Sequence, residues 1–367
     1  MITSNKKGKV LVAMSGGIDS SISALLLKQQ GYELVGITMK TWDYETSKVN
    51  GKETGCCSLD SINDARIVAV KLGFPHYVLD IREEFTEKII QNFIDEYING
   101  RTPNPCVLCN TYIKWDALLK RADALGCDYI ATGHYSQIRY ENGRYIISKG
   151  KDTTKDQTYV LWGLTQDVLS RTIFPLSGYT KAEVREIAKR EGFDYLAKKS
   201  ESYDICFIPD GDYRTFLNNQ VPDLPEKVGE GNFIYKDKVI GKHKGYPYYT
   251  IGQRKGLDVA LGHPVYVKEI RPDTNEVILG DKEELAQQII RVRDYNLIKY
   301  EKLPENYQAL VKIRYKDVGK MSTIHTIDDK HLEIVFHEPV YAVAPGQSAV
   351  FYEGDDLVGG GFIEKSI

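Results

Sequence analysis

Apolar and polar positions in the first half of the chain alternate between two spacings. Short apolar runs with strand character occur at residues 10–13, 34–38, 76–79 and 129–132. Longer stretches with helical spacing occur at residues 20–30, 61–72, 83–98 and 110–125. Helices between short apolar strands predict an α/β fold with a doubly wound parallel sheet.

The pattern changes near residue 200. Residues 137–148 resemble a hairpin around Asn142-Gly143, a strong turn signal. Further on, helical spacing fades, and short β-rich runs are separated by Gly, Pro and Tyr. We expect a connector at 222–225 and two small β units at 231–266 and 291–363. The predicted domains are therefore an α/β domain (1–200), a β-rich module (201–280) and a C-terminal β domain (281–367).

Composition narrows the class of protein only modestly. The 367 residues have an apolar fraction of 42% and a net charge of −3, which neither requires nor excludes a nucleic-acid partner. No apolar run approaches the length of a membrane span, and no secretory leader is visible, so we expect a cytoplasmic protein without a membrane partner. Six cysteines are too few for a disulfide scaffold of this length, and we expect them to be catalytic, metal-binding or buried.

The segment Ser-Gly-Gly-Ile-Asp-Ser-Ser at residues 15–21 lies between the first strand and the first helix. Gly16 and Gly17 let the backbone approach phosphate oxygens, and the helix N-terminus favours an anion. The segment lacks the lysine of a Walker A loop and carries Asp19, which could hold Mg²⁺. The alternative is an ordinary glycine turn between a strand and a helix.

A second strong feature is the run at residues 101–110, which contains the spacing C-x-x-C. Pro103 and Pro105 predict a stiff, non-helical loop. A helix starting near Asn110 would place Cys109 at its N-terminus and lower the pKa of that thiol. Buried thiols or half of a zinc site are the alternatives, and without a second C-x-x-C we do not expect structural zinc.

The other cysteines carry less information. Taken alone, Cys206 and Cys127 are typical of buried core cysteines. Cys56 and Cys57 lie in a predicted loop after Gly55, and their role stays open.

The segment 15–21 resembles the SGGxDS[ST] loop of the PP-loop ATP pyrophosphatases, which split ATP into AMP and pyrophosphate. Further segments make the chain similar to the bacterial tRNA-specific 2-thiouridylases, which thiolate the wobble uridine U34. These segments are residues 14–21, 56–66, 102–110, 131–135, 155–159, 201–209, 249–257 and 345–347. Their order along nearly the whole chain carries the resemblance. Another PP-loop ligase, or an RNA-binding protein with a relic nucleotide loop, remains the alternative.

The resemblance implies roles for individual residues. Cys109, in N-P-x-x-x-C-N, corresponds to the nucleophile, and Cys206, in D-I-C-F, to the cysteine that accepts sulfur as a persulfide. The implied ATP contacts are Met14, Ser15, Gly16, Gly17, Ile18, Asp19, Ser20, Ser21, Met39 and Gly133, with Mg²⁺ near Asp19. The implied sulfur donor is a cysteine desulfurase or a sulfur carrier protein. A C-terminal β-barrel is implied as well.

The resemblance also implies contacts with tRNA that accepts lysine, glutamate or glutamine. Those lining the target base are Asn104, Pro105 and Cys106. The other implied contacts are His134, Asp156, Gln157, Thr158, Arg314, Tyr315 and Gln347. From the residues themselves, strand alternation predicts Lys312, Arg314 and Lys316 on one face, where they track phosphates or form a solvated sheet face.

The chain departs from the family pattern at Cys106, where many members carry aspartate. A thiol is a weaker base than a carboxylate and positions uracil less well. Cys106, Cys109 and Cys206 together could instead hold a [4Fe–4S] cluster whose open iron binds sulfide. A cluster-dependent thiolation is therefore a second mechanism to test.

Overall fold

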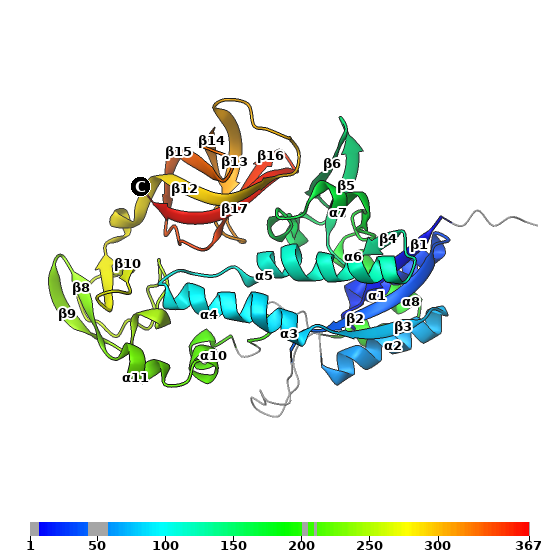
Figure 1. The fold of residues 1–367 in the computed structure, drawn as a ribbon, viewed down its shortest axis with the longest axis horizontal. Helices are drawn as coiled ribbons and strands as arrows, with labels where there is room; N and C mark the ends of the chain where they lie inside the picture. Colours follow the sequence, from blue (N-terminus) through cyan, green and yellow to red (C-terminus); the bar gives the residue numbers. More distant parts are fainter. Residues whose placement is uncertain (1–6, 43–57, 200–204, 209–210, 367) are drawn as a thin grey trace, which may run out of the picture. The chain divides into compact units, whose positions relative to one another are not determined.

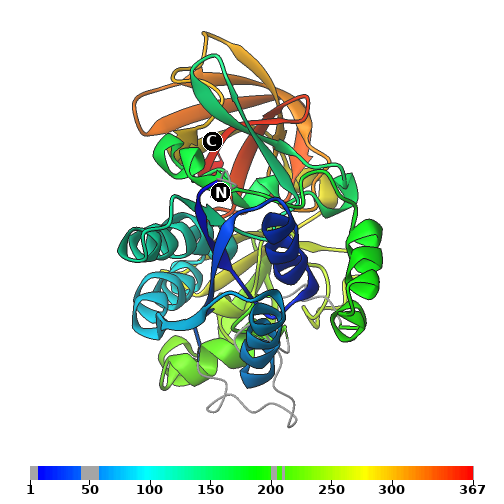
Figure 2. The same cartoon turned by 90° about the vertical axis from the view of Figure 1, so that its right-hand side faces the viewer.

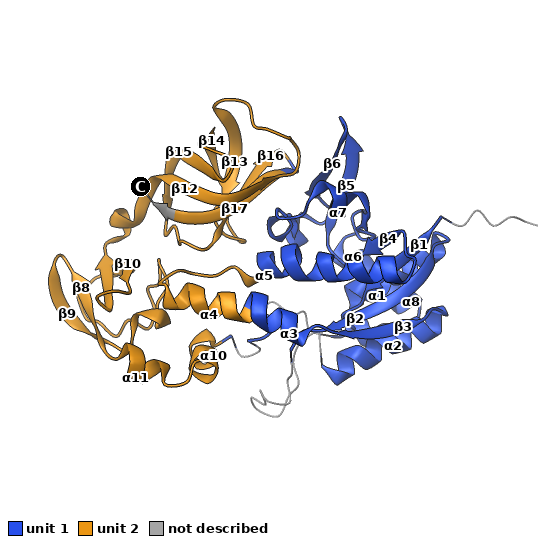
Figure 3. Ribbon diagram, in the orientation of Figure 1, with its two compact units in different colours: residues 1–89, 106–211, 355–357 blue, residues 90–105, 212–354, 358–367 orange. Residues whose placement is uncertain are grey.

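The computed structural model describes residues 7–42, 58–199, 205–208 and 211–366 (Figure 1). Two compact units make up the chain (Figure 3). Unit 1 comprises residues 1–89, 106–211 and 355–357, and unit 2 comprises 90–105, 212–354 and 358–367. Cys56 and Cys57 lie outside the described residues.

Unit 1 is built on a parallel sheet of five strands in the order β3-β2-β1-β4-β7. Its strands are β1 (Lys9–Ala13), β2 (Glu33–Lys40), β3 (His76–Asp80), β4 (Tyr129–Ala131) and β7 (Thr172–Ile173). The first four confirm the sequence prediction. The two residues of β7 are too few to show a periodic pattern, so this strand was not predicted.

Helices cover both faces of this sheet. The helices of unit 1 before the thiol-bearing segment are α1 (Ile18–Gln29), α2 (Leu59–Leu72) and α3 (Arg82–Phe85). A π-helical turn (Thr86–Ile90) connects α3 to α4 (Gln91–Ile98), which belongs to unit 2. Later helices are α5 (Pro105–Leu108), a π-helical turn (Cys109–Lys114), α6 (Trp115–Ala124), α7 (Gln166–Ser170), α8 (Lys181–Arg190) and α9 (Asp194–Ala197). Val10 and Val12 pack with α1, α2 and α8, and Figure 2 gives a second view of these helices. Leu11 points to the opposite face and is also fully buried, so the doubly wound prediction is confirmed.

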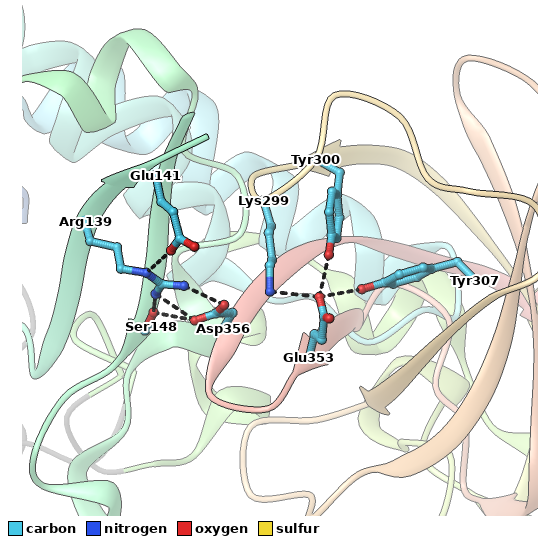
Figure 4. A network of polar contacts seen from close by, with 8 residues as sticks. All are labelled: Arg139, Glu141, Ser148, Lys299, Tyr300, Tyr307, Glu353 and Asp356. Atoms are coloured by element: carbon cyan, nitrogen blue, oxygen red, sulfur yellow. Dashed lines mark hydrogen bonds and ion pairs between the residues drawn. The ribbon is translucent and has the colours of Figure 1, made fainter. Parts of the chain in front are cut away.

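A β-hairpin in unit 1 follows the sheet. Strands β5 (Ser136–Glu141) and β6 (Arg144–Lys149) meet at Asn142 and Gly143, whose φ angles of 52° and 81° fit the predicted Asn-Gly turn. Asp356, at the start of β17, pairs with Ser148 of β6. The guanidinium of Arg139 donates to both Asp356 oxygens at 2.8 and 2.7 Å (Figure 4).

Unit 2 contains a small four-stranded sheet in the order β10-β11-β8-β9. Its elements are α10 (Tyr213–Gln220), α11 (Leu224–Val228), β8 (Gly231–Tyr235), β9 (Lys238–His243), β10 (Tyr266–Arg271) and β11 (Glu276–Gly280). The predicted connector at 222–225 is wrong, because α11 begins at Leu224. Proline is compatible with the first turn of a helix, and Pro225 occupies that turn.

The C-terminal part of unit 2 forms a β-barrel, which confirms the expected C-terminal fold. Its strands are β12 (Ala286–Leu297), β13 (Tyr307–Lys312), β14 (Lys320–Thr326), β15 (His331–Tyr341), β16 (Ser348–Glu353) and β17 (Asp356–Ser366). β17 pairs with β12, which closes the barrel. Glu353 at the end of β16 bonds Lys299, Tyr300 and Tyr307 (Figure 4). None of the helices described in either unit has the length and apolar character of a membrane span.

Candidate active site

The segment 15–21 lies where the strand order of the sheet reverses. β1 has β2 on one side and β4 on the other, and ligands of such sheets bind at this switch point, beyond the strand ends. Gly133 follows β4, and a Cβ there would lie 3.0 Å from both the carbonyl carbon of Asp19 and the nitrogen of Ser20. The structure therefore brings Gly133 against the first turn of α1, although the two segments are far apart in sequence.

The backbone of this loop requires glycine. Gly16 has a φ of +68°, and a Cβ there would lie 2.0 Å from the carbonyl oxygen of Ser61. Gly17 is the N-cap of α1 and has no side chain to cap the helix. The Ser20 hydroxyl accepts from the Ser15 amide at 3.1 Å and donates to the Gly17 carbonyl at 3.1 Å. The N-terminus of α1, with no side chain capping it, is thus shaped for an anion.

Not every residue of the predicted ATP-binding set faces outward. Met14 and Ile18 bury their side chains in the core of unit 1, and Ser21 is fully buried with its hydroxyl donating to Gly17. Met39, next to the end of β2, is half-buried. A nucleotide could therefore contact the backbone of Met14, Ile18 and Ser21, but not their side chains.

Asp19 forms an ion pair that the sequence analysis missed. The ammonium of Lys181 donates to its two carboxylate oxygens at 2.7 Å each, and the Tyr135 hydroxyl donates to Oδ1 at 2.7 Å. Lys181 begins α8 and its side chain is only 9% exposed. The capping box of Thr180 and Glu183 was a visible signal for the start of α8, but nothing in it indicates the partner of Lys181.

A second lysine, Lys199, also reaches the loop. Its ammonium pairs with Asp64 of α2 and lies 3.4 Å from the Gly16 carbonyl oxygen. Two cations from distant parts of the sequence therefore lie beside the phosphate-binding candidate, although the segment 15–21 contains none. Each is paired with a carboxylate, Lys181 with Asp19 and Lys199 with Asp64, so a phosphate group would have to share or displace that carboxylate to bind the ammonium.

The segment around the two nearby thiols differs from its prediction. A helix begins at Pro105 rather than near Asn110, because proline fits the first position of a helix. Cys109 is therefore a full turn inside the helical segment, where it starts the π-helical turn Cys109–Lys114. Such turns occur frequently at functional sites. The prediction that a helix N-terminus lowers the pKa of the Cys109 thiol therefore has no geometric basis.

Cys106 lies in the first turn instead. Its side chain reaches solvent, yet the protein atoms crowded around it raise the pKa of the thiol, and the positive charge of Lys114 only partly offsets this. A raised pKa disfavours the thiolate, which is the more nucleophilic form of a cysteine.

Tyr135, which binds Asp19, links the segment 15–21 to the tRNA-contact candidates at residues 156–158 of unit 1. The Gln157 side-chain oxygen accepts from the Tyr135 amide at 3.0 Å, and Asp156 accepts from the Thr158 amide and hydroxyl. Thr158 is fully buried. Asn110, next to Cys109, donates to the Val160 carbonyl at 3.0 Å and ties the π-helical turn to this segment.

His134 is buried in an aromatic environment. Its ring lies 5.5 Å from that of Trp115 and 5.8 Å from that of Phe174, and its Nδ1 shares a hydrogen bond of 2.7 Å with the Thr132 hydroxyl. Burial, helped by the charge of Lys114, lowers its pKa to about 3. His134 is thus a neutral imidazole at physiological pH.

Cys206 is half-buried in unit 1 and lies beside two anchored residues. Phe207 and Ile208 are each 2% exposed, and the Phe207 ring packs against Trp42 and Phe85. Among the described residues, no three His, Cys, Asp or Glu side chains are placed to hold a metal ion. The structure therefore lends no support to a cluster held by Cys106, Cys109 and Cys206.

The predicted row of basic residues on one strand face is wrong. β13 ends at Lys312, and after the buried Ile313 the chain turns at the exposed residues Arg314, Tyr315 and Lys316. The Asp317 carboxylate accepts from the Ile313 amide and ends the strand. Arg314 and Tyr315 are exposed, as a nucleic-acid contact requires. Asn104 and Gln347 both belong to unit 2.

The sheet order and the loop at its switch point define an ATP-binding α/β protein of the HUP class, joined to two β domains. Family models match the chain along its length: a tRNA methyl transferase HUP domain over residues 8–210, a tRNA methyl transferase PRC-barrel domain over 214–281 and an aminomethyltransferase beta-barrel domain over 287–363.

Curated relatives give the family its name. The chain is 61% identical to the tRNA-specific 2-thiouridylase MnmA of Amoebophilus asiaticus, over 98% of this chain and 96% of the relative. The MnmA proteins of Cytophaga hutchinsonii (57%, over 99% of each chain) and Salinibacter ruber (56%, over 98% of this chain and 95% of the relative) are similar to it as well. The chain belongs to the tRNA-specific 2-thiouridylase family.

Proposed function

We propose that this protein is an ATP-dependent tRNA sulfurtransferase that converts the wobble uridine U34 to 2-thiouridine. One observation carries the proposal: unit 1 contains both the loop suited to phosphates and the thiols of Cys109 and Cys206. The first provides a place to activate an oxygen, and the second provides sulfur chemistry. The names of the relatives support tRNA as the substrate.

The chemistry follows from the stability of the uracil C2 carbonyl, whose oxygen is a poor leaving group. That oxygen attacks the α-phosphate of ATP, pyrophosphate leaves, and the oxygen becomes part of an AMP leaving group. The outer sulfur of a Cys206 persulfide then bonds to C2. It does so either as hydrosulfide, released when the Cys109 thiolate attacks the inner sulfur, or directly, in which case the Cys109 thiolate attacks the inner sulfur afterwards and breaks the S–S bond. AMP departs, a Cys109–Cys206 disulfide remains, and a dithiol reductant returns two electrons to reopen it.

Asp19 is the carboxylate proposed to hold the Mg²⁺ that accompanies ATP. Its oxygens accept from Lys181 and Tyr135, so the metal would exchange with the Lys181 ammonium. Lys181 would then be released toward the phosphates. The ion would add positive charge at the phosphates, which supports departure of pyrophosphate.

The persulfide route is preferred to the cluster-dependent one on a structural observation: no metal-holding group is found among the described residues. We include a cysteine desulfurase or a sulfur carrier protein as the sulfur donor, and lysine, glutamate and glutamine tRNAs as the substrates. The base-lining role of Asn104, Pro105 and Cys106 belongs to the same proposal.

The test is nucleoside analysis of tRNA from a strain without this protein. We expect wobble 2-thiouridine to disappear and to return when the wild-type gene is restored. In a strain without a paralogue, normal levels of 2-thiouridine would contradict the proposal. Incubation of the purified protein with tRNA, ATP, Mg²⁺ and a persulfide donor, followed by mass spectrometry of the nucleosides, tests the reaction directly.

A further inference from the structure

Residues 102–104 of unit 2 form hydrogen bonds with the segment that leads into barrel strand β16. The Thr102 amide donates to the Pro345 carbonyl at 2.8 Å. The Asn104 side-chain amide lies 3.4 Å from the Ser348 hydroxyl. A loop that precedes the thiols in sequence is thus held by residues from near the other end of the chain.

Gln347 supplies the central contact of this set. Its Nε2 donates to the carbonyl oxygen of Pro103 at 2.8 Å and to that of Thr102 at 3.3 Å. The backbone of Gln347 is itself fixed, since its amide donates to Ala344 at 3.2 Å and its carbonyl accepts from Ile363 at 2.7 Å. One side chain, on a residue directly before β16 whose backbone is hydrogen-bonded on both sides, therefore binds two successive carbonyls of the loop.

The backbones approach so closely that Gly346 is required. Gly346 has a φ of +91°, and a Cβ there would lie 2.7 Å from both the Thr102 carbonyl oxygen and Oε2 of Glu96. Glu96 is buried and binds Arg101 through two hydrogen bonds of 2.6 and 2.9 Å. The residue before the loop is thus held as well.

The composition of the loop explains why it needs outside partners. Pro103 and Pro105 have no N–H groups, which limits the backbone hydrogen bonds that the loop can form by itself. Buried carbonyls must still be satisfied, and Pro103 is buried. Along the chain, Asn104 leads directly into the helical segment that begins at Pro105 and contains Cys106 and Cys109.

We propose that Gln347 is a positioning residue: by binding the carbonyls of Pro103 and Thr102, it orients Asn104 toward the uracil. The inference rests on the proposed function, and it adds a role to the tRNA contact that the family resemblance implies for Gln347. It follows that the barrel helps to set the geometry of the loop at residues 102–105 before any RNA is bound.

The test compares Gln347→Glu with Gln308→Glu, a charge-matched change at an exposed glutamine of barrel strand β13. A carboxylate cannot donate to the two carbonyls. In the protein without tRNA or ATP, we expect hydrogen exchange at the Thr102 amide to be about tenfold faster in Gln347→Glu and unchanged in Gln308→Glu. At saturating tRNA, where a weaker tRNA contact no longer limits the rate, we expect thiolation by Gln347→Glu to be about tenfold slower than in wild type.

Two results would overturn the proposal. One is unchanged exchange at Thr102. The other is a loss confined to tRNA affinity with full turnover at saturation, which would make Gln347 an RNA contact only. If Gln347→Glu does not fold, Gln347→Met removes the donor without adding a charge and gives the same readouts. The exchange measurement does not depend on thiolation, so it tests the positioning role even if the proposed function fails.

Discussion

The ammonium of Lys181 lies 2.7 Å from each carboxylate oxygen of Asp19. Asp19 belongs to the phosphate-binding candidate at residues 15–21 and to the first turn of α1. Lys181 is almost completely buried, whereas Asp19 is one-third exposed. A cation is therefore already present where an anionic ligand and its metal are proposed to bind. This relationship leads to the first prediction.

Replacing Lys181 with methionine should weaken ATP binding by about tenfold, because a buried cation beside the phosphates is lost. It should also lower the free energy of unfolding by about 1–3 kcal/mol, since Asp19 loses its charged partner. Calorimetric titration with ATP and urea denaturation measure the two effects. Lys189→Met on the same helix is the control, because Lys189 is exposed and pairs with Glu186 across one turn. Unchanged ATP affinity in Lys181→Met would contradict the role.

Gly16→Ala should abolish ATP binding, because the new Cβ would overlap the Ser61 carbonyl and distort the loop. The matched control is Gly73→Ala. Gly73 has a similar φ of +70°, but a Cβ there meets no described atom within 4 Å. The control should lose only about 1 kcal/mol of stability from backbone strain and keep its ATP affinity. Equal behaviour of the two variants would show that the close approach to Ser61 is unimportant.

Serine in place of Cys109 or Cys206 should lower thiolation by at least about a hundredfold while tRNA-dependent ATP–pyrophosphate exchange continues, because adenylation needs neither thiol. Cys127→Ser, at a buried cysteine whose thiol has a raised pKa, is the control and should retain turnover. Turnover in either active-site variant would favour a different PP-loop ligase. Iron in the anaerobically purified wild-type protein, required for activity, would instead favour the cluster-dependent mechanism.

The buried imidazole of His134 should make stability depend on pH. Its pKa is about 3 in the folded protein against an ordinary value of 6.5, so below pH 6.5 the unfolded chain binds a proton that the folded chain does not. Its contribution to stability is complete above pH 6.5 and falls by about 1.4 kcal/mol per pH unit as the pH decreases toward 3. Urea denaturation between pH 7.5 and 4.5 should show a shallower decline in His134→Gln than in wild type. His325→Gln, on barrel strand β14, is the control; an equal decline in wild type and His134→Gln would refute the prediction.

Local sequence patterns were sufficient to predict the first four strands of the unit 1 sheet and its β-hairpin. The strands at 10–13 and 34–38 are continuous apolar runs, and Asn142-Gly143 has one strongly favoured turn conformation. The phosphate-binding candidate was found for the same reason, since its signal lies within seven adjacent residues. The predicted domain boundaries near 200 and 280 stay predictions.

Residues that act across long sequence separations could not be found in this way. The partner of Asp19 is Lys181, and the partner of Pro103 is Gln347; neither pair has a local signature. The strand predicted through residue 316 failed because the Asp317 side chain satisfies the Ile313 amide in place of a neighbouring strand. Hydrophobic spacing predicts which face of an element is buried, but it does not predict such side-chain contacts.

The pairing of Arg139 with Asp356 has a consequence for synthesis of the protein. A ribosome makes the chain from its N-terminus, and domains commonly fold in that order. Unit 1, however, includes residues 355–357, which emerge only after most of unit 2 has been made. Until then the hairpin that carries Arg139 and Ser148 lacks the carboxylate that binds both. The nascent α/β unit therefore stays incomplete until the barrel has been translated.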